Sequence, residues 1–171
     1  DDGKSIGDKN EYGPILGGIG ELNNYPKALD VILTIGKPST LAFLAGKIKN
    51  KLINFPNMIA PDMRYLDINN KTMGKGNIFF SKCSLSCNVR IGDFNIFNNS
   101  IAIGHDTIIG SYNSFMSGAR ISGEVIIGDL NFFGVYSVIL QQIRIGMNTT
   151  VGAGSIVIRN TDDNSTYIGN P

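Results

Sequence analysis

The feature that most constrains this chain is an apolar residue at every sixth position over 85 residues, from position 73 to position 157. Buried helix faces repeat about every 3.6 residues and strand faces about every 2, so neither an α-helical repeat nor a simple antiparallel sheet fits this period. Short strands joined by tight corners do fit it. The apolar positions are Met73, Phe79, Leu85, Ile91, Phe97, Ile103, Ile109, Phe115, Ile121, Ile127, Phe133, Ile139, Ile145, Val151 and Val157.

A second period of eighteen residues lies on top of the first, because a glycine follows every third apolar position. Three hexads therefore form one coil, and the expected coils are 73–90, 91–108, 109–126, 127–144 and 145–162. Stacked coils form a triangular prism in which each strand hydrogen-bonds to the strands above and below it, about 4.8 Å away. The repeating glycines are Gly74, Gly92, Gly110, Gly128 and Gly146. A second column has polar side chains that are expected to hydrogen-bond from coil to coil as a ladder, at Asn77, Asn95, Asn113, Asn131 and Thr149.

The pattern predicts a mostly β fold, a parallel β-helix of about five to six coils spanning 56–171. Residues 1–55 lack the period and predict a small, incomplete α/β subdomain: a strand over 28–36, a helix that begins near Pro38, and a strand over 52–55. Residues 56–72 are expected to form an imperfect first coil with corners at Pro56 and Pro61. Because the chain opens on Asp1 rather than Met, we expect that an N-terminal segment is missing.

Charge and composition exclude several classes of partner. The chain has 15 Lys and Arg residues against 14 Asp and Glu, a net charge of +1, which gives no basic surface for nucleic acid or anionic lipid. No apolar run approaches the roughly eighteen residues of a membrane span, and no signal region opens the chain, so a cytoplasmic protein is expected. The two cysteines, Cys83 and Cys87, are expected to be free, buried thiols.

His105 is the only histidine of the chain. It lies two positions past the inward Ile103, so it falls at a corner of the prism and should point outward. Eighteen residues later stands Gly123, whose missing side chain is expected to leave space for a ligand beside the imidazole. A carboxylate at the adjacent Asp106 would orient the ring or raise its basicity. An ordinary solvent-facing corner is the alternative, and for Glu124, one coil above Asp106, a solvated charge is the expectation.

Several short motifs resemble the hexapeptide-repeat sugar acetyltransferases, the group that includes bacterial nucleotide-amino-sugar N-acetyltransferases and sialic acid O-acetyltransferases. The resemblance implies a left-handed β-helix, against the right-handed rule for parallel crossovers. It also implies that His105 is the general base, that Asp106 tunes it, and that acetyl-CoA is the acyl donor. The motifs are Ile103-Gly104-His105-Asp106, Gly118-Ala119-Arg120-Ile121-Ser122-Gly123, Ile127-Gly128-Asp129, Val151-Gly152-Ala153-Gly154-Ser155 and Ile168-Gly169-Asn170-Pro171.

The resemblance further implies where the ligands bind. Gly123 and Ala153 match backbone positions that contact acetyl-CoA in a cleft between the subunits of a homotrimer. Asn98 matches a position near the sugar acceptor. Some members have a second histidine nine residues after the first that meets the cofactor. This chain has Ser114 there, so that contact is lost or replaced.

Two glycine-containing segments of the N-terminal part bear on a nucleotide site. Gly36 and Lys37 end the expected strand, where open α/β sheets place ligands, and are candidates for the nucleotide side of the acceptor. A strand-ending turn with a solvated lysine is the alternative. The run Gly17-Gly18-Ile19-Gly20 lacks the third glycine of a dinucleotide fingerprint at the required spacing.

These observations favour an acetyl-CoA-dependent N-acetyltransferase that acts on a nucleotide-linked amino sugar, and O-acetylation of sialic acid or a related sugar is the close alternative. A zinc carbonic anhydrase of similar architecture needs three histidines around each metal, which a single histidine does not supply, and no metal is expected. A non-catalytic structural or ice-binding β-helix remains a third hypothesis. It would require flat outward rows of threonine, whereas the outward rows here are mixed and charged.

Overall fold

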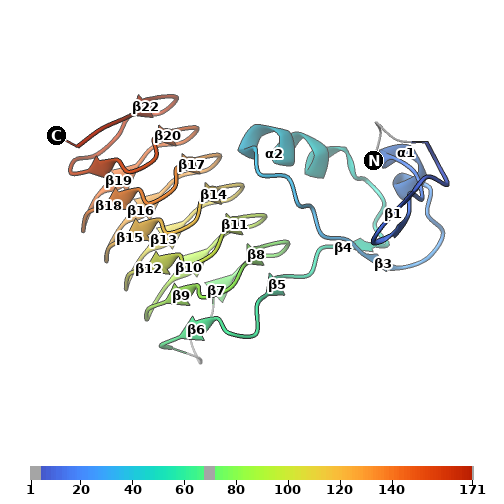
Figure 1. The fold of residues 1–171 in the computed structure, drawn as a ribbon, viewed down its shortest axis with the longest axis horizontal. Coiled ribbons are helices and arrows are strands. Elements are labelled where there is room, and N and C mark those ends of the chain that lie inside the picture. Colours follow the sequence, from blue (N-terminus) through green and yellow to red (C-terminus); the bar gives the residue numbers. More distant parts are fainter. Residues whose placement is uncertain (1–4, 68–71, 171) are drawn as a thin grey trace.

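The computed structural model describes residues 5–67 and 72–170, and its main feature is a prism of stacked two-residue strands. Three parallel sheets form the three faces of this prism. Figure 1 shows the coils following one another along a single axis from β5 to β22, with the N-terminal elements to one side. The mostly β architecture expected from the six-residue period is therefore confirmed.

Each face stacks strands from successive coils, and among the described residues the three faces have five, seven and six strands. The first face consists of β7 (Thr72–Met73), β10 (Arg90–Ile91), β13 (Ile108–Ile109), β16 (Ile126–Ile127) and β19 (Arg144–Ile145). The second face consists of β5 (Met58–Ile59), β8 (Ile78–Phe79), β11 (Ile96–Phe97), β14 (Ser114–Phe115), β17 (Phe132–Phe133), β20 (Thr150–Val151) and β22 (Thr166–Tyr167). The third face consists of β6 (Arg64–Tyr65), β9 (Ser84–Leu85), β12 (Ala102–Ile103), β15 (Arg120–Ile121), β18 (Val138–Ile139) and β21 (Ile156–Val157).

The strand register follows the eighteen-residue period through the middle of the prism, as in the pairing of Ile91 with Ile109. The two ends depart from it. Tyr65 pairs with Leu85, twenty residues on, so the expected imperfect first coil is two residues longer than the others. Its additional residues fall between β6 and β7, a stretch that includes the undescribed 68–71. In the last coil Val151 pairs with Tyr167, only sixteen residues on, so that coil is shorter than the expected 145–162.

Stacked phenylalanines fill the prism behind the second face. Their neighbouring ring centroids lie 4.2, 4.7 and 4.5 Å apart with nearly parallel planes. Each side chain is at most 1% exposed, so the rings exclude water from the centre of successive coils. The stacked residues are Phe79, Phe97, Phe115 and Phe133.

An asparagine ladder runs parallel to the phenylalanines. The Nδ2 of Asn113 donates to Oδ1 of Asn95 at 3.0 Å, and Asn95 donates in the same way to Asn77 at 3.0 Å. At the top of the ladder the backbone N–H of Thr149 donates to Oδ1 of Asn131 at 2.6 Å. These side chains are buried, and the ladder gives most of their polar groups partners inside the prism, although Nδ2 of Asn131 has none among the described residues.

The N-terminal part contains the expected β-α-β unit. β3 (Leu29–Asp30) and β4 (Ile53–Asn54) pair in parallel, and α2 (Pro38–Lys47) connects them. β3 is shorter than the predicted 28–36 because only two of its residues find ladder partners on β4. A hairpin of β1 (Lys9–Asn10) and β2 (Gly13–Pro14) and the short helix α1 (Ile19–Asn23) precede the unit.

The β-α-β unit covers part of the outer side of the second face. Leu41 of α2 is 1% exposed and belongs to a buried cluster with Ile78 and Ile96, whose side chains point out of the prism. Phe94 joins this cluster and packs edge-on against Phe55. Across residues 5–67 and 72–170, no helix combines the length and apolar character required to cross a lipid bilayer.

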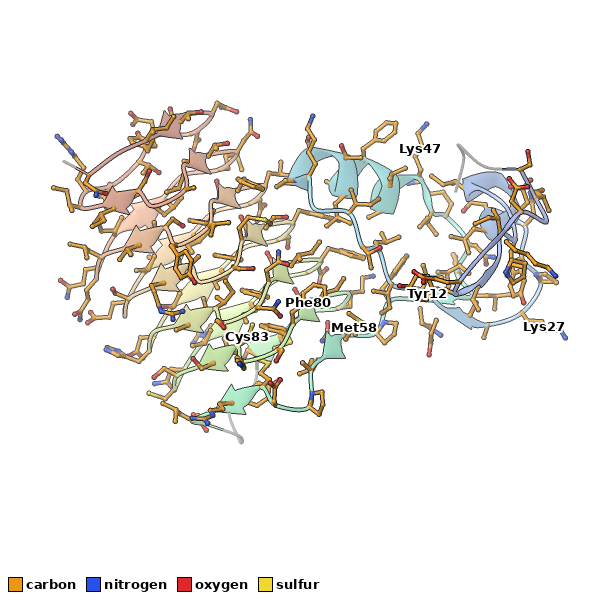
Figure 2. The ribbon with its side chains drawn as sticks, in the orientation of Figure 1. Tyr12, Lys27, Lys47, Met58, Phe80 and Cys83 are labelled. Atoms are coloured by element: carbon orange, nitrogen blue, oxygen red, sulfur yellow. The ribbon has the colours of Figure 1, made fainter. Side chains whose placement is uncertain are left out.

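The two cysteines differ in exposure, and both are free. Cys83 is buried in the coils, where Figure 2 labels it, and its thiol donates to the carbonyl oxygen of Asn98 at 3.0 Å. Cys87 is exposed because it lies at an outer corner of the prism. The expectation of buried thiols is therefore confirmed for Cys83 and wrong for Cys87.

Replacing Phe115 by Ala should remove the central ring of the stack and leave a cavity that the neighbouring rings cannot close. We expect the free energy of unfolding to fall by about 3–5 kcal/mol. The measurement is urea-induced unfolding followed by circular dichroism. Phe43→Ala is the matched control, because Phe43 is 59% exposed on α2, and it should cost far less. Equal losses in the two variants would contradict the stacked core.

Candidate active site

The sole histidine lies at the edge where the third face turns into the first. We call residues 86–88, 104–106, 122–124 and 140–142 the histidine corner. The last residue of each turn has a left-handed backbone, with φ of 56° at Asn88, 55° at Asp106, 59° at Glu124 and 64° at Gln142. Asn and Asp tolerate this conformation better than most residues. Polar side chains therefore line one edge of the prism in successive coils.

His105 and Asp106 form a contact within this corner. Nδ1 of His105 lies 2.8 Å from Oδ2 of Asp106, and the two side chains are 46% and 49% exposed. The hydrogen bond from His105, and then one from Asn88, holds the pKa of Asp106 below its usual range. An ionised carboxylate only accepts hydrogen bonds, so Nδ1 of the neutral imidazole carries the proton and Nε2 has a free lone pair. That arrangement suits a group that accepts a proton at Nε2.

Two glycines set the space around the imidazole. A Cβ added at Gly104 would collide with the backbone of Ser122 and Gly123 in the next coil, so successive coils approach too closely there for any side chain. A Cβ added at Gly123 would lie 2.5 Å from Nε2 of His105. The space over Gly123 is therefore occupied by the imidazole itself, and the expectation that it is left for a ligand is wrong. The ring packs against the backbone of Gly123.

Among the described residues, the Glu124 carboxylate makes its side-chain hydrogen bonds to glutamines and not to the imidazole. Its two carboxylate oxygens accept from Nε2 of Gln141 at 2.7 Å and from Nε2 of Gln142 at 3.0 Å. These bonds, that from Gln142 first, lower the pKa of Glu124. The carboxylate is exposed, as expected for a corner charge, but it is held by neighbours on the same corner. The sequence-based predictions did not include either glutamine. Their place one coil after Gly123 and Glu124 could have identified them as neighbours of the Glu124 carboxylate.

Asn98 and Ala153 lie at a different edge of the prism. Both follow strands of the second face, β11 and β20, and so belong to the corner between the second and third faces. The Nδ2 of Asn98 donates to the carbonyl oxygen of Phe115 at 3.2 Å. Ala153 is exposed and lies three coils further along the axis. A single chain therefore does not bring either residue together with His105.

Ser114 does not lie on the surface. It is 0% exposed, and its Oγ has no hydrogen-bond partner among the described residues. A cofactor bound on the surface would not reach this hydroxyl. The proposed replacement of a cofactor contact by Ser114 is therefore not compatible with its burial.

Gly36 and Lys37 are exposed and lead into α2, with Lys37 at its N-cap. Next to this turn lies a cavity of about 940 Å³ in the N-terminal part, whose walls are mostly apolar. Gly17 and Gly18 contribute to its lining together with Thr34 and Ile35. The fold thus brings Gly17 and Gly18 to the segment that precedes Gly36, although this segment is not the expected strand end, because β3 ends at Asp30. Figure 2 shows this region, with Tyr12 and Lys27, well apart from Phe80 and Cys83 in the coils.

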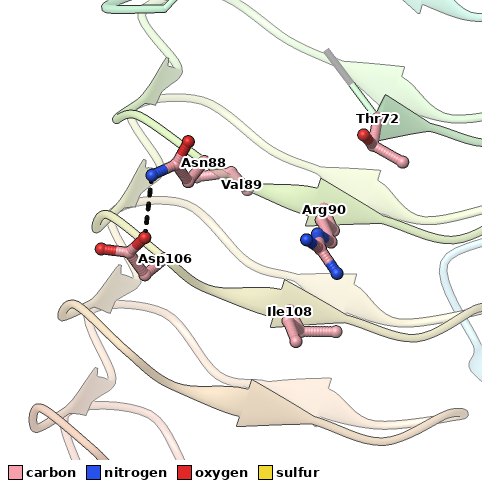
Figure 3. A pocket seen from close by; sticks show the side chains of 6 residues that line it. All are labelled: Thr72, Asn88, Val89, Arg90, Asp106 and Ile108. Carbon is pink, nitrogen blue, oxygen red and sulfur yellow. Dashed lines mark hydrogen bonds between the residues drawn. The ribbon is translucent and has the colours of Figure 1, made fainter. Parts of the chain in front are cut away.

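A second hollow, of about 380 Å³, lies against Asp106 on the first face. Figure 3 shows it from close by, with Arg90 and Ile108 from neighbouring coils at one side and Asn88 and Asp106 at the other. No group of three or more His, Cys, Asp or Glu side chains that could hold a metal ion occurs in the described ranges 5–67 and 72–170.

Gly123→Ala is expected to displace the imidazole while leaving the fold intact, because the three atoms nearest to the added Cβ all belong to the imidazole ring. In protein labelled with ¹⁵N-histidine, the ring signals should move away from those of a ring with the proton on Nδ1. Gly104→Ala is the comparison, since its Cβ meets backbone and should lower the thermal midpoint as well. Unchanged ring signals in Gly123→Ala would rule out the contact between the ring and Gly123.

Asp106→Asn should destabilise the protein in a pH-dependent way. The folded-state pKa of Asp106 lies below its ordinary value of 3.8, so the carboxylate stabilises the fold at neutral pH. This contribution is lost as the pH falls through the lowered pKa, where wild type and variant should converge. Asn suits the same left-handed backbone and limits other effects. Urea midpoints at pH 7 and at about pH 3 test this prediction, and a constant difference would contradict it.

No protein-family model matches the sequence, and no curated protein sequence matches it either. Solved structures do match. WeeI from Acinetobacter baumannii is 24% identical, with 99% of this chain and 81% of that chain covered and a TM-score of 0.89. The acetyltransferase domain of PglB from Neisseria gonorrhoeae, in complex with acetyl coenzyme A, is 22% identical, with 97% and 80% covered and a TM-score of 0.87.

A third similar structure is PerB from Caulobacter crescentus in complex with CoA and GDP-perosamine. It is 24% identical, 92% of this chain and 76% of that chain are covered, and the TM-score is 0.86. The agreement extends over the N-terminal unit as well as the coils, since nearly the whole chain is covered. The chain therefore has the left-handed parallel β-helix fold of these acetyltransferase structures.

Proposed function

We propose that this protein is an acetyl-CoA-dependent N-acetyltransferase that acts on a nucleotide-linked amino sugar, with His105 as general base. The observation that carries the proposal is the His105–Asp106 pair, whose geometry leaves Nε2 free to accept a proton. The fold adds support, because similar structures include an acetyltransferase domain with acetyl coenzyme A and PerB with CoA and GDP-perosamine. A structure from the same organism as PerB is described as a perosamine N-acetyltransferase.

The proposed reaction is a direct transfer without a covalent enzyme intermediate. The sugar amine attacks the thioester carbonyl carbon, and Nε2 of His105 takes a proton from the amine nitrogen. Asp106 stabilises the imidazolium that forms, through its bond to Nδ1. The carbon–sulfur bond then breaks, the acetyl group stays on the nitrogen, and CoA leaves as the thiol after it receives the proton. A backbone N–H near the carbonyl oxygen would stabilise the negative charge of the tetrahedral intermediate.

The proposal includes a homotrimer with acetyl-CoA bound between neighbouring copies. The backbone of Gly123, rather than the space over its Cα that the imidazole fills, would contact the cofactor beside His105, and the exposed backbone of Ala153 would contact it from the second edge of the prism. Asn98 would face the sugar acceptor. These residues lie at two different edges of one chain, so a neighbouring copy is the way to bring both edges to one ligand.

For the nucleotide of the acceptor we propose the N-terminal part. Gly36 and Lys37 lie beside the cavity of about 940 Å³. Lys37 is exposed and is the N-cap residue of α2. Its positive charge and the partial positive charge at the N-terminus of the helix would both favour a phosphate there. The apolar walls of the cavity suit a base or sugar ring better than a second phosphate.

The test is acetyl-CoA turnover, followed by thiol release, against GDP- and UDP-linked amino sugars and free sialic acid. Wild type should be active on an amino sugar, and His105→Ala should lose activity by about 10²-fold or more, because it lacks the group that takes the proton. Asn148→Ala is a matched control at a distant corner and should retain activity.

Each other outcome has a definite meaning. Turnover of sialic acid alone would assign O-acetylation instead, since Nε2 can equally take a proton from a hydroxyl. Full activity in His105→Ala would eliminate the general base. A folded wild-type protein that turns over none of the acceptors would favour a non-catalytic β-helix.

A further inference from the structure

Asn88 binds the carboxylate oxygen of Asp106 that His105 does not bind. Its Nδ2 donates to Oδ1 of Asp106 at 3.0 Å, while Oδ2 of Asp106 accepts from Nδ1 of His105 at 2.8 Å. Figure 3 shows the Asn88–Asp106 bond crossing from one coil to the next. Each carboxylate oxygen thus has its own donor, and the two donors come from different coils.

Two bonds restrain an exposed carboxylate more than one does. Asp106 is about half exposed, and with the histidine bond alone its carboxylate would be free to rotate and exchange that bond for water. The amide of Asn88 fixes Oδ1 and therefore the plane of the group. The left-handed backbone at both residues, with φ of 56° and 55°, repeats the same turn in both coils and places the two side chains one above the other.

The restraint determines which imidazole nitrogen carries the proton. A neutral imidazole that is free in water favours the proton on Nε2, the form that could not act as a base at that atom. A fixed Asp106 carboxylate instead holds the proton on Nδ1. Nε2 then carries the free lone pair, and the edge of the ring that holds Nε2 lies next to Gly123 of the following coil.

Among the described residues, no other side chain of the histidine corner donates to Oδ1 of Asp106 in place of Asn88. Glu124 is bound by Gln141 and Gln142, and the exposed thiol of Cys87 makes a contact only with the hydroxyl of Ser86, at 4.0 Å, among the described residues. We propose that Asn88 is a positioning residue: through Asp106 it keeps His105 in the tautomer with the proton on Nδ1. Its effect on catalysis rests on the proposed function, whereas its effect on the tautomer does not.

The direct test is ¹⁵N NMR of the imidazole in protein labelled with ¹⁵N-histidine, at a pH where the ring is neutral. The chain has one histidine, so every ring signal belongs to His105. Wild type should show mainly the form protonated on Nδ1. In Asn88→Ala, the ¹⁵N chemical shifts of both ring nitrogens should move toward those of the form protonated on Nε2.

Two further variants separate the lost amide from general damage. Asn88→Gly removes the side chain and tolerates the left-handed backbone, so it should give the same change without strain. Asn148→Ala is the matched control: Asn148 also has a left-handed backbone, with φ of 51°, and donates to Asn164 in another coil at 2.8 Å. It should keep the wild-type ring signals. Wild-type signals in both Asn88 variants would overturn the proposal.

Kinetics provides the second readout. Loss of one hydrogen bond that orients the base should lower kcat by about threefold to tenfold, with little change in the KM for acetyl-CoA. If wild type turns over no acceptor, the proposed function fails but the NMR comparison still decides the role of Asn88. If turnover depends on His105 while both Asn88 variants keep the wild-type tautomer and kcat, only the positioning role fails.

Discussion

The interaction on which this structure depends is the hydrogen bonding between successive coils. No two-residue strand is stable alone, and each one gains its partners from the coils above and below. That pairing holds equivalent residues in register, so like side chains stack in columns. The phenylalanine and asparagine columns are two results of this register: the first fills the prism, and the second forms hydrogen bonds between buried amides of successive coils.

The same stacking builds the candidate active site. The coils approach so closely at Gly104 that a side chain there would strike the next coil, and at Gly123 the missing side chain makes room for the imidazole. Asn88, Asp106 and His105 form a hydrogen-bonded chain only because their coils are adjacent. The geometry of the proposed base is thus a consequence of the repeat.

The N-terminal unit gives the prism unequal faces. By covering the outer side of the second face it buries Ile78 and Ile96. The uncovered edges carry His105 on one side and Asn98 and Ala153 on another. This division is why a ligand that uses all three positions requires more than one chain, and why the proposed site includes a neighbouring copy.

The sequence by itself determined the coils, their register through the middle of the prism and the corner position of His105, because these follow from periods of six and eighteen residues. It also determined the β-α-β unit, through the apolar strand segments and the proline at the start of the helix. It also placed Asp106 beside His105, as neighbours in the chain. Tertiary structure alone decided that Ser114 is buried, that Cys87 is exposed, that the imidazole occupies the space over Gly123, and that Asn88 holds Asp106. Those properties depend on which surfaces pack together and on how far side chains reach between coils. A periodic pattern in the sequence specifies neither of these.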